Sequence, residues 1–444
     1  MKRETIISAQ EAGDRLSGLG SEYLVVHNPE YIYPPFEMYP LAPPVESLDG
    51  RPPAAVVMDM DGTTTTTETL CIHSLETMVR RITGRHTADQ WAGLDRKRDY
   101  PHIIGNSTTK HVEYLVKAYK EHITREDTAS AFLNAAVWTL SRGKDETRKK
   151  EVLATLKALG WKSLVSESLF SSAAENGTCP DSKDLRDILR RYCRQLRIDS
   201  MQDTVRASID IYYHRYHEVL SMISGGQGRS LSEELTGGRP LIEPMPGVCE
   251  LLLLVRGELT GREDSLYTGL VRHYEKSVTP EQERKMRSRL DRLCGLFADS
   301  PAKTAVVTSS IRYEADTVLN EVFRILRKQA SVIVGEKRAA EVFSTPSQCY
   351  DVLITASDSS EIRLKPHRDL YSVALHTIGI MPDDFSRVIG FEDSEPGTQA
   401  IRASGIGLCA AVPFSDTADH DLSAAVHVLK GGLPQAILEY GLFI

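Results

Sequence analysis

The stretch Val56–Glu68, VVMDMDGTTTTTE, joins an apolar run to two aspartates and five threonines. A short continuous apolar run is typical of a strand that is buried on both faces of a parallel sheet. Because side chains alternate along a strand, Asp59 and Asp61 point the same way if the strand persists to Asp61. Two like charges at one place are costly unless a cation or a shared proton offsets them. Gly62 permits a turn directly after the pair, so the stretch favours an active site over a low-complexity loop.

Further apolar runs of this kind come later in the chain and are separated by helical patterns. They lie at Thr304–Thr308, Tyr350–Thr355, Arg387–Phe391 and in GIGLCAAVP, residues 405–413. Alternating strands and helices predict an α/β fold with a doubly wound parallel sheet. After the first strand, apolar residues recur at three- and four-residue spacing over residues 68–243, which predicts an inserted helical domain.

These patterns predict a domain organisation with three parts. Residues 51–67 and 244–444 would form the catalytic core, with a helical insertion at about 258–300, and residues 68–243 would form the helical domain. Residues 1–50 would form an extended arm, because the proline-rich stretch NPEYIYPPFEMYPLAPP cannot form a regular helix.

Composition excludes several classes of protein. The 444 residues are 41% hydrophobic and 26% charged, as in ordinary globular proteins. A formal net charge of -8 argues against nucleic acid or an anionic membrane as a partner. The seven cysteines are scattered and form no C-x-x-C pair, which indicates a protein of the reducing cytoplasm. We find neither a signal-peptide pattern nor an apolar run long enough to span a bilayer.

A second acidic cluster also follows a predicted strand. Glu392 and Asp393 would lie at the same sheet edge as Asp59, so as many as four carboxylates could converge there. Oxygen ligands of this number match Mg²⁺. Lys365 could supply a further cation for a phosphoryl substrate. Thr308, together with the backbone amides of the two serines that follow it, could donate hydrogen bonds to phosphate.

Four segments in this order resemble the motifs of the haloacid dehalogenase superfamily. They are Asp59-x-Asp61-Gly62-Thr63, Thr308-Ser309-Ser310, Lys365-Pro366 and Gly390-Phe391-Glu392-Asp393-Ser394. The tracts PMPGVCELL and KPHRDLYSVAL further resemble the β-phosphoglucomutase-like branch of that superfamily. The resemblance covers about half of the chain, and four motifs in order make it specific.

The resemblance implies a role for each motif residue. Asp59 would be the nucleophile that forms an aspartyl-phosphate, and Asp61 would be the general acid and then the general base. Asp59, the backbone carbonyl of Asp61 and Asp393 would hold Mg²⁺, and Glu392 would assist directly or through water. Thr308, Ser309 and Lys365 would bind the transferring phosphoryl group.

The helical domain would then be a mobile cap that excludes water from the site. In the branch that it resembles, a polar cap loop reads the substrate, so Asn106, Ser107 and Lys110 are the candidate substrate-binding residues. The cap is longer than is usual in this branch, and Thr66 stands where relatives often carry an acidic residue. Neither the substrate nor the oligomeric state therefore follows from the resemblance.

Three functions remain open at this stage. A Mg²⁺-dependent phosphohydrolase acting on a small, phosphosugar-like metabolite fits best, and a β-phosphoglucomutase-type mutase would use the same residues. A non-catalytic metabolite-binding protein on this fold is the third, although such a protein has no physical need for paired carboxylates beside Lys365.

Overall fold

The computed structural model describes residues 6–28, 32–87, 89–104, 108–160, 192, 195–274, 277–360, 363–414, 417 and 420–443. The chain divides into two compact units. The first, the α/β unit, comprises Met1–Thr66 and Ile242–Ile444, and the second, the helical unit, comprises Thr67–Leu241. Within the described ranges, no helix is both long and apolar enough to cross a membrane.

A six-stranded parallel sheet is the centre of the α/β unit, and its strand order is β10-β9-β8-β3-β6-β7. The strands are β3 (Ala55–Asp59), β6 (Lys303–Val307), β7 (Val352–Ile354), β8 (Val388–Glu392), β9 (Leu408–Ala411) and β10 (His427–Val428). The chain extends the sheet to one side of β3 through β6 and β7, then to the other side through β8, β9 and β10. This reversal confirms the predicted doubly wound α/β fold and makes β3 the point at which ligands bind in such sheets. The short strand β10 was not predicted.

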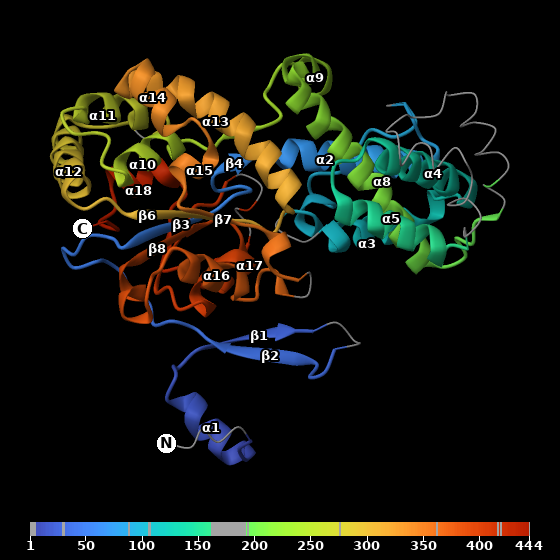
Figure 1. Ribbon diagram of the computed structural model, residues 1–444, viewed down its shortest axis with the longest axis horizontal. Coiled ribbons are helices and arrows are strands. Elements are labelled where there is room, and N and C mark those ends of the chain that lie inside the picture. The colour runs from blue at the N-terminus through green and yellow to red at the C-terminus, as the bar shows by residue number, and fades with distance from the viewer. Residues whose placement is uncertain are drawn as a thin grey trace. The chain divides into compact units, whose positions relative to one another are not determined.

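Helices cover both faces of the sheet (Figure 1). Helices α16 (Asp369–Thr377) and α17 (Glu395–Ala403) pack on the face that carries Ala55 and Val57. Helices α10 (Val248–Val255), α13 (Arg312–Val334) and α18 (Gly432–Leu438) lie on the opposite side of the sheet. Side chains of β3 point alternately to both layers, and all five of its residues are buried.

The other described elements of the α/β unit are helices of 3 to 20 residues and two small sheets. The helices are α11 (Glu263–Val271), α12 (Pro280–Asp299), α14 (Glu336–Val342), α15 (Pro346–Cys349), η6 (Ala356–Asp358) and η8 (Pro382–Arg387). Helices α11 and α12 occupy the range where we predict a helical insertion. Strands β4 (Thr65–Thr66) and β5 (Glu243–Pro244) pair antiparallel, so the two ends of the inserted segment meet in one ladder.

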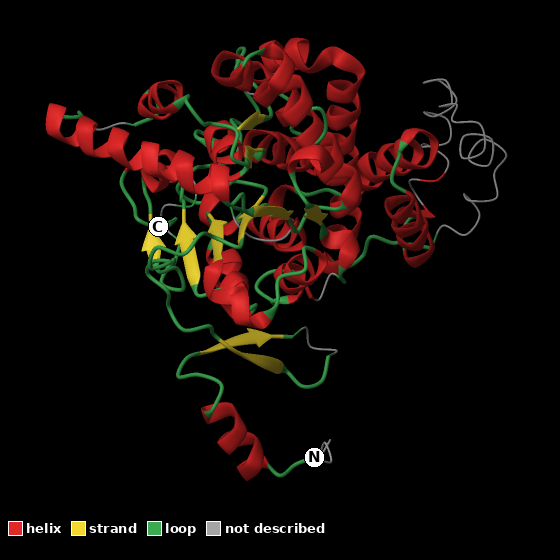
Figure 2. Cartoon of the chain, turned by 60° about the vertical axis from the view of Figure 1, so that its left-hand side comes forward, coloured by secondary structure: helices red, strands yellow, loops and turns green. Residues whose placement is uncertain are grey.

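The N-terminal arm has more regular structure than the prolines indicate. It contains the helix α1 (Ala9–Ser17), which begins at a Ser8 capping box, and an antiparallel hairpin of β1 (Tyr23–His27) and β2 (Phe36–Pro40). Figure 2 shows the hairpin as a separate pair of strands beside the main sheet. The proline-rich stretch can form a strand because Pro34 and Pro35 lie before β2 and Pro40 is its last residue, where no ladder donor is lost.

The helical unit is a bundle around α8 (Met201–Met222), whose buried side chains face α2, α3 and α4. Its other described elements are α2 (Glu68–Thr83), η1 (Tyr100–His102), α3 (Thr108–Ala118), η2 (Lys120–His122), α4 (Arg125–Arg142), α5 (Glu146–Ala158), η5 (Ile223–Gln227) and α9 (Gly228–Thr236). Capping groups mark the ends of its long helices, as at Ser200 before α8 and Thr124 before α4.

Candidate active site

Asp59 is the last residue of β3 and is buried at the carboxyl end of the sheet. The apolar run before it places it there, because four buried residues hold the strand between two layers. Burial and the neighbouring Glu392 carboxylate raise the pKa of Asp59 well above its usual value, and Lys365 acts in the opposite direction. A buried carboxylate in this setting is favourable only while cations stay close to it.

The turn after Asp59 is built by Gly62 and two threonines. Gly62 has a φ of 92°, and a Cβ atom there would lie 2.5 Å from Oδ2 of Asp393. The hydroxyl of Thr64 donates to the backbone carbonyl of Asp59 at 2.6 Å, and that of Thr63 lies 3.4 Å from Oδ1 of Asp393. The first threonines of the run therefore fix the loop, while Thr65 and Thr66 belong to β4.

The Asp61 carboxylate is held by hydroxyls that follow β6. Its Oδ2 atom accepts hydrogen bonds from Thr308 at 3.0 Å and from the Ser310 hydroxyl at 3.1 Å. The backbone amide of Ser310 donates to the Thr308 hydroxyl at 2.9 Å. Ser309, which we selected from sequence, has an exposed side chain. The contribution of the Ser310 side chain was not predicted, although the run of hydroxyl residues T-S-S contained the signal.

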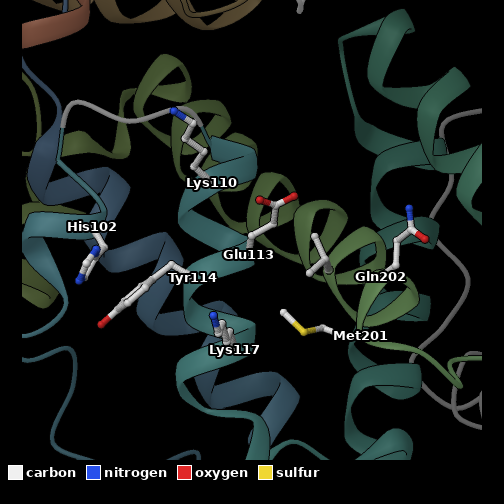
Figure 3. Close-up of a pocket in the computed structure, with 8 residues that line it drawn as sticks. His102, Lys110, Glu113, Tyr114, Lys117, Met201 and Gln202 are labelled. Atoms are coloured by element: carbon white, nitrogen blue, oxygen red, sulfur yellow. The ribbon is translucent and has the colours of Figure 1, made fainter. Parts of the chain in front are cut away.

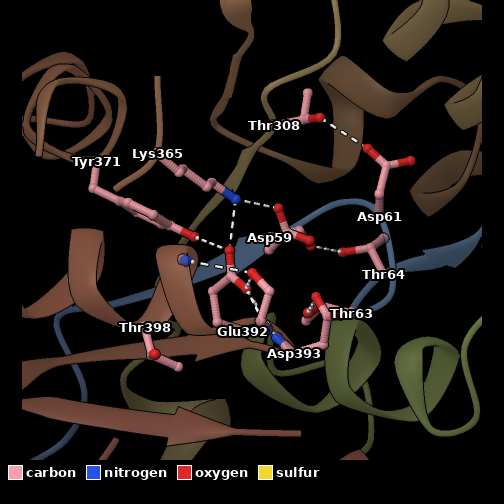
Figure 4. A network of polar contacts seen from close by, with 12 residues as sticks. Asp59, Asp61, Thr63, Thr64, Thr308, Lys365, Tyr371, Glu392, Asp393 and Thr398 are labelled. Atoms are coloured by element: carbon pink, nitrogen blue, oxygen red, sulfur yellow. Dashed lines mark hydrogen bonds and ion pairs between the residues drawn. The ribbon is translucent and has the colours of Figure 1, made fainter. Parts of the chain in front are cut away.

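Lys365 connects the two acidic strand ends (Figure 4). Its Nζ atom donates to Oδ1 of Asp59 and, at 2.6 Å, to Oε1 of Glu392. Only 8% of the Lys365 side chain is exposed. Burial lowers the pKa of Lys365, but the carboxylates of Asp59 and Glu392 outweigh this effect and raise the pKa above its usual value. The ammonium group therefore stays charged within the site.

Glu392, the last residue of β8, collects several donors. Its Oε2 atom accepts from the backbone amide of Asp393 at 2.9 Å and from the amide and hydroxyl of Ser394 at 3.0 and 2.9 Å. Its Oε1 atom accepts from Lys365 and, at 3.2 Å, from the hydroxyl of Tyr371. Gly397 makes room for this group, because a Cβ atom there would lie 1.7 Å from Oε1.

Tyr371 was not among the predicted residues. It lies on α16, its side chain is fully buried, and the Lys365 ammonium is 5.2 Å from the centre of its ring. Its position six residues after Lys365, in the tract KPHRDLYSVAL, is the only sequence signal for it. Burial and the nearby Glu392 carboxylate raise the pKa of Tyr371 well above its usual value, so its hydroxyl remains a donor.

The carboxylates have the chemistry of a divalent-cation site. Ligand oxygens of Asp59, Glu392 and Asp393 lie within 4.8 Å of one another, and all three residues are buried. Oxygen ligands that carry more negative charge than a single lysine offsets fit Mg²⁺. The oxygens of Glu392 already accept several donors, so this carboxylate has little capacity left to bind a metal directly.

The predicted substrate-binding residues are in the helical unit. Asn106 and Ser107 lie outside the described residues. Lys110, on α3, lines a cavity of about 690 Å³ together with His102, Glu113, Tyr114, Lys117 and residues of α8 (Figure 3). This cavity is formed within the helical unit, and Lys110 and Lys117 are the two lysines among the residues that line it.

We compared the chain with known families, curated proteins and solved structures. No family model and no curated protein matches it. It is similar to CbbY from Rhodobacter sphaeroides in complex with phosphate, with 13% identity, 87% of this chain and 99% of that chain covered and a TM-score of 0.40. It is also similar to β-phosphoglucomutase from Clostridium difficile, at 12% identity, 86% and 92% coverage and a TM-score of 0.32. A HAD family hydrolase from Deinococcus radiodurans with bound phosphate and sodium has 13% identity, 85% and 91% coverage and a TM-score of 0.31.

Proposed function

We propose that the protein is a Mg²⁺-dependent phosphohydrolase that acts on a small, phosphosugar-like metabolite through an aspartyl-phosphate at Asp59. The observation that carries this proposal is the position of the Asp59 carboxylate. It lies buried at the carboxyl end of the central strand, in contact with the Lys365 ammonium and close to Asp393. A nucleophile, a cation and further acidic ligands at one point are the parts that phosphoryl transfer needs.

In the first step, an Asp59 carboxylate oxygen forms a bond to phosphorus as the bond from phosphorus to the leaving oxygen breaks. Asp61, in its protonated form, gives its proton to that leaving oxygen. The hydroxyls of Thr308 and Ser310 orient the Asp61 carboxylate for this transfer. Lys365 binds the phosphoryl oxygens, on which negative charge is spread in the transition state. Thr308 would donate to a phosphoryl oxygen only when its hydroxyl leaves the Asp61 carboxylate, because it has a single proton to give.

In the second step, Asp61 takes a proton from a water molecule while the water oxygen attacks phosphorus. The bond between phosphorus and Asp59 breaks, inorganic phosphate leaves, and the Asp59 carboxylate is regenerated. When bound, Mg²⁺ would offset the charge of the carboxylates and of the phosphoryl oxygens. Asp59, Asp393 and the backbone carbonyl of Asp61 would hold it, with Glu392 behind them.

The helical unit would serve as the cap in this scheme. Its insertion between β4 and β5 supports this role, because both ends of the segment meet beside the loop that carries Asp61. Lys110 would bind an anionic group of the substrate. Hydrolase and mutase differ only in whether water or a substrate hydroxyl receives the phosphoryl group, which depends on how well the cap excludes water.

Turnover of p-nitrophenyl phosphate with Mg²⁺ tests the proposal. We expect Asp59→Asn to lower kcat at least about 10³-fold, because the amide is a poor nucleophile. The matched control is Asp383→Asn at an exposed position of the same unit, which should keep parental turnover. The hydrolase proposal would be refuted if Asp59→Asn kept metal-dependent turnover. It would also be refuted if the parent showed no such turnover.

A second assay separates the two enzymatic functions. Phosphorylated sugars are offered to the parent, and both inorganic phosphate and isomerised sugar phosphate are measured. Release of phosphate supports the hydrolase. Interconversion of isomers without net phosphate release, dependent on a bisphosphate primer, would establish the mutase instead.

A further inference from the structure

The N-terminal hairpin contacts the Lys365 loop on both sides of the lysine. The Glu37 carboxylate on β2 accepts a hydrogen bond from Arg363 at 2.6 Å, two residues before Lys365. Two residues after it, Nδ1 of His367 lies 2.8 Å from the hydroxyl of Tyr39, which is also on β2. Two positions of one strand, two residues apart, thus contact the chain before and after Lys365.

These contacts form one continuous chain of hydrogen bonds. The Tyr39 hydroxyl donates to Glu37 at 2.5 Å, and burial together with Glu37 raises its pKa to about 12, so it keeps its proton. Since that single proton is directed to Glu37, the Nδ1 atom of His367 must be the donor to the Tyr39 oxygen. Arg363 also makes two bonds to Asp369, at 2.8 and 2.9 Å, in the first turn of α16. The hairpin is therefore bonded directly to Arg363 and His367 of the segment 363–369, and Arg363 connects it to Asp369.

The hairpin is itself fixed to the α/β unit. Val26 and Tyr39 pack against Ala403 of α17, and Arg402 donates to the backbone carbonyl of Ala42 at 2.8 Å. The Ala42 amide returns a bond to the Arg402 carbonyl at 2.9 Å. Half-buried bonds from an anchored strand hold a loop more tightly than surface ion pairs, because water competes less for the same groups.

We propose that the β1–β2 hairpin is a positioning element for Lys365, with Glu37 and Tyr39 as the positioning residues. The hairpin holds segment 363–369 so that the Lys365 ammonium stays against Asp59 and Glu392. This inference rests on the proposed function for its kinetic consequence, since a misplaced cation stabilises the transferring phosphoryl group less well. Displacements of about 1 Å that start far from the chemistry can cost on the order of 10²-fold in rate.

The test compares the parent with Tyr39→Phe, Glu37→Gln and the double variant. Tyr39→Phe keeps the buried ring and removes only the hydroxyl. The matched control is Met38→Ala, between the two positions but on the exposed outer face of the hairpin. Deuterium exchange of the peptide that spans 363–369 is measured by mass spectrometry, and kcat and KM are measured with p-nitrophenyl phosphate and Mg²⁺.

We expect faster exchange of segment 363–369 in the double variant, with kcat about tenfold lower and KM within about twofold of the parent. Met38→Ala should match the parent in both measurements. Unchanged exchange in the double variant would overturn the proposal, as would faster exchange with unchanged kcat or an equal effect of Met38→Ala. If the parent itself shows no Asp59-dependent turnover, the proposed function is wrong. The exchange comparison then decides by itself whether the hairpin holds the loop.

Discussion

The two units bury charged side chains in opposite ways. At the carboxyl end of the sheet, the buried carboxylates of Asp59 and Glu392 both contact the Lys365 ammonium group, and the Asp393 carboxylate lies close to them. In the helical unit, Arg81 of α2 and Arg215 of α8 are directed at imidazoles. Nη1 of Arg81 donates to Nδ1 of His214 at 3.0 Å, and Nε of Arg215 donates to Nε2 of His73 at 3.1 Å.

The histidines of the basic cluster in the helical unit are neutral, which limits the positive charge that the cluster buries. Burial and the adjacent guanidinium groups lower the pKa of His214 to about 3 and that of His73 to about 4. Glu218 accepts from Arg215 at 2.7 Å and supplies the carboxylate of the cluster. An imidazole can give up its charge near neutral pH, so this cluster needs no added ion.

The acidic site of the α/β unit has no comparable way to relieve its charge. Its carboxylates lose charge only by protonation, which the raised pKa of Asp59 reflects, or by binding a cation. Buried charge therefore has different consequences in the two clusters, because histidines can become neutral near pH 7 and carboxylates need a proton or a cation. The basic cluster lowers its charge through its own histidines, while the acidic cluster keeps carboxylates close enough to share a cation.

Removal of the Lys365 ammonium group from the acidic site should have the largest effect. Lys365→Met leaves buried carboxylates without their partner, so we expect the free energy of unfolding without metal to fall by about 3 kcal/mol. Added Mg²⁺ should restore part of this loss. Chemical denaturation with and without Mg²⁺ measures both, and Lys337→Met at an exposed position is the control. Equal stability of Lys365→Met and the parent would show that the site tolerates its charge without the lysine.

A smaller effect is expected at the turn beside Asp393. Gly62→Ala combines an unfavourable φ of 92° with a Cβ atom 2.5 Å from Asp393, which should cost about 3 kcal/mol or less and lower turnover. Gly50→Ala is a matched control, since its φ is 76° but nothing lies within 4 Å of the added atom. It should cost about 1 kcal/mol and keep turnover. Similar losses in both would mean that backbone strain, and not the approach to Asp393, accounts for the effect.

The smallest effect concerns pH and the basic cluster. The pKa of His214 is lowered to about 3 in the folded protein, so its contribution to stability is complete above about pH 6.5 and is lost as pH falls toward 3. At pH 5 the free energy of unfolding should have fallen by about 2 kcal/mol from this cause. His214→Gln keeps an acceptor for Arg81 and should lose less stability than the parent between pH 7.5 and pH 5 in denaturant titrations. His86→Gln, at an exposed position, should follow the parent; parental behaviour of His214→Gln would contradict the pKa assignment.

Much of the candidate site could be predicted because its residues occupy strand ends. A buried apolar run marks its own strand, and the carboxyl ends of parallel strands meet at one edge. This is why Asp59, Thr308 and Glu392 could be grouped before the structure was known. Ser310 and Tyr371 could not be assigned, since nothing local says which hydroxyl reaches a carboxylate on another strand.

The sequence by itself determined the alternation of strands and helices, the insertion of a helical segment after β3, and the order of the acidic, hydroxyl and lysine motifs. These depend on local periodicity and on the chain order alone. Tertiary structure decided that Asp61 is held by Thr308 and Ser310, that Glu392 accepts from Lys365 and from Tyr371 of α16, and that a hairpin from residues 23–40 brackets Lys365. Such contacts join positions up to 328 residues apart. Their geometry is set by how the layers pack, which local sequence patterns do not encode.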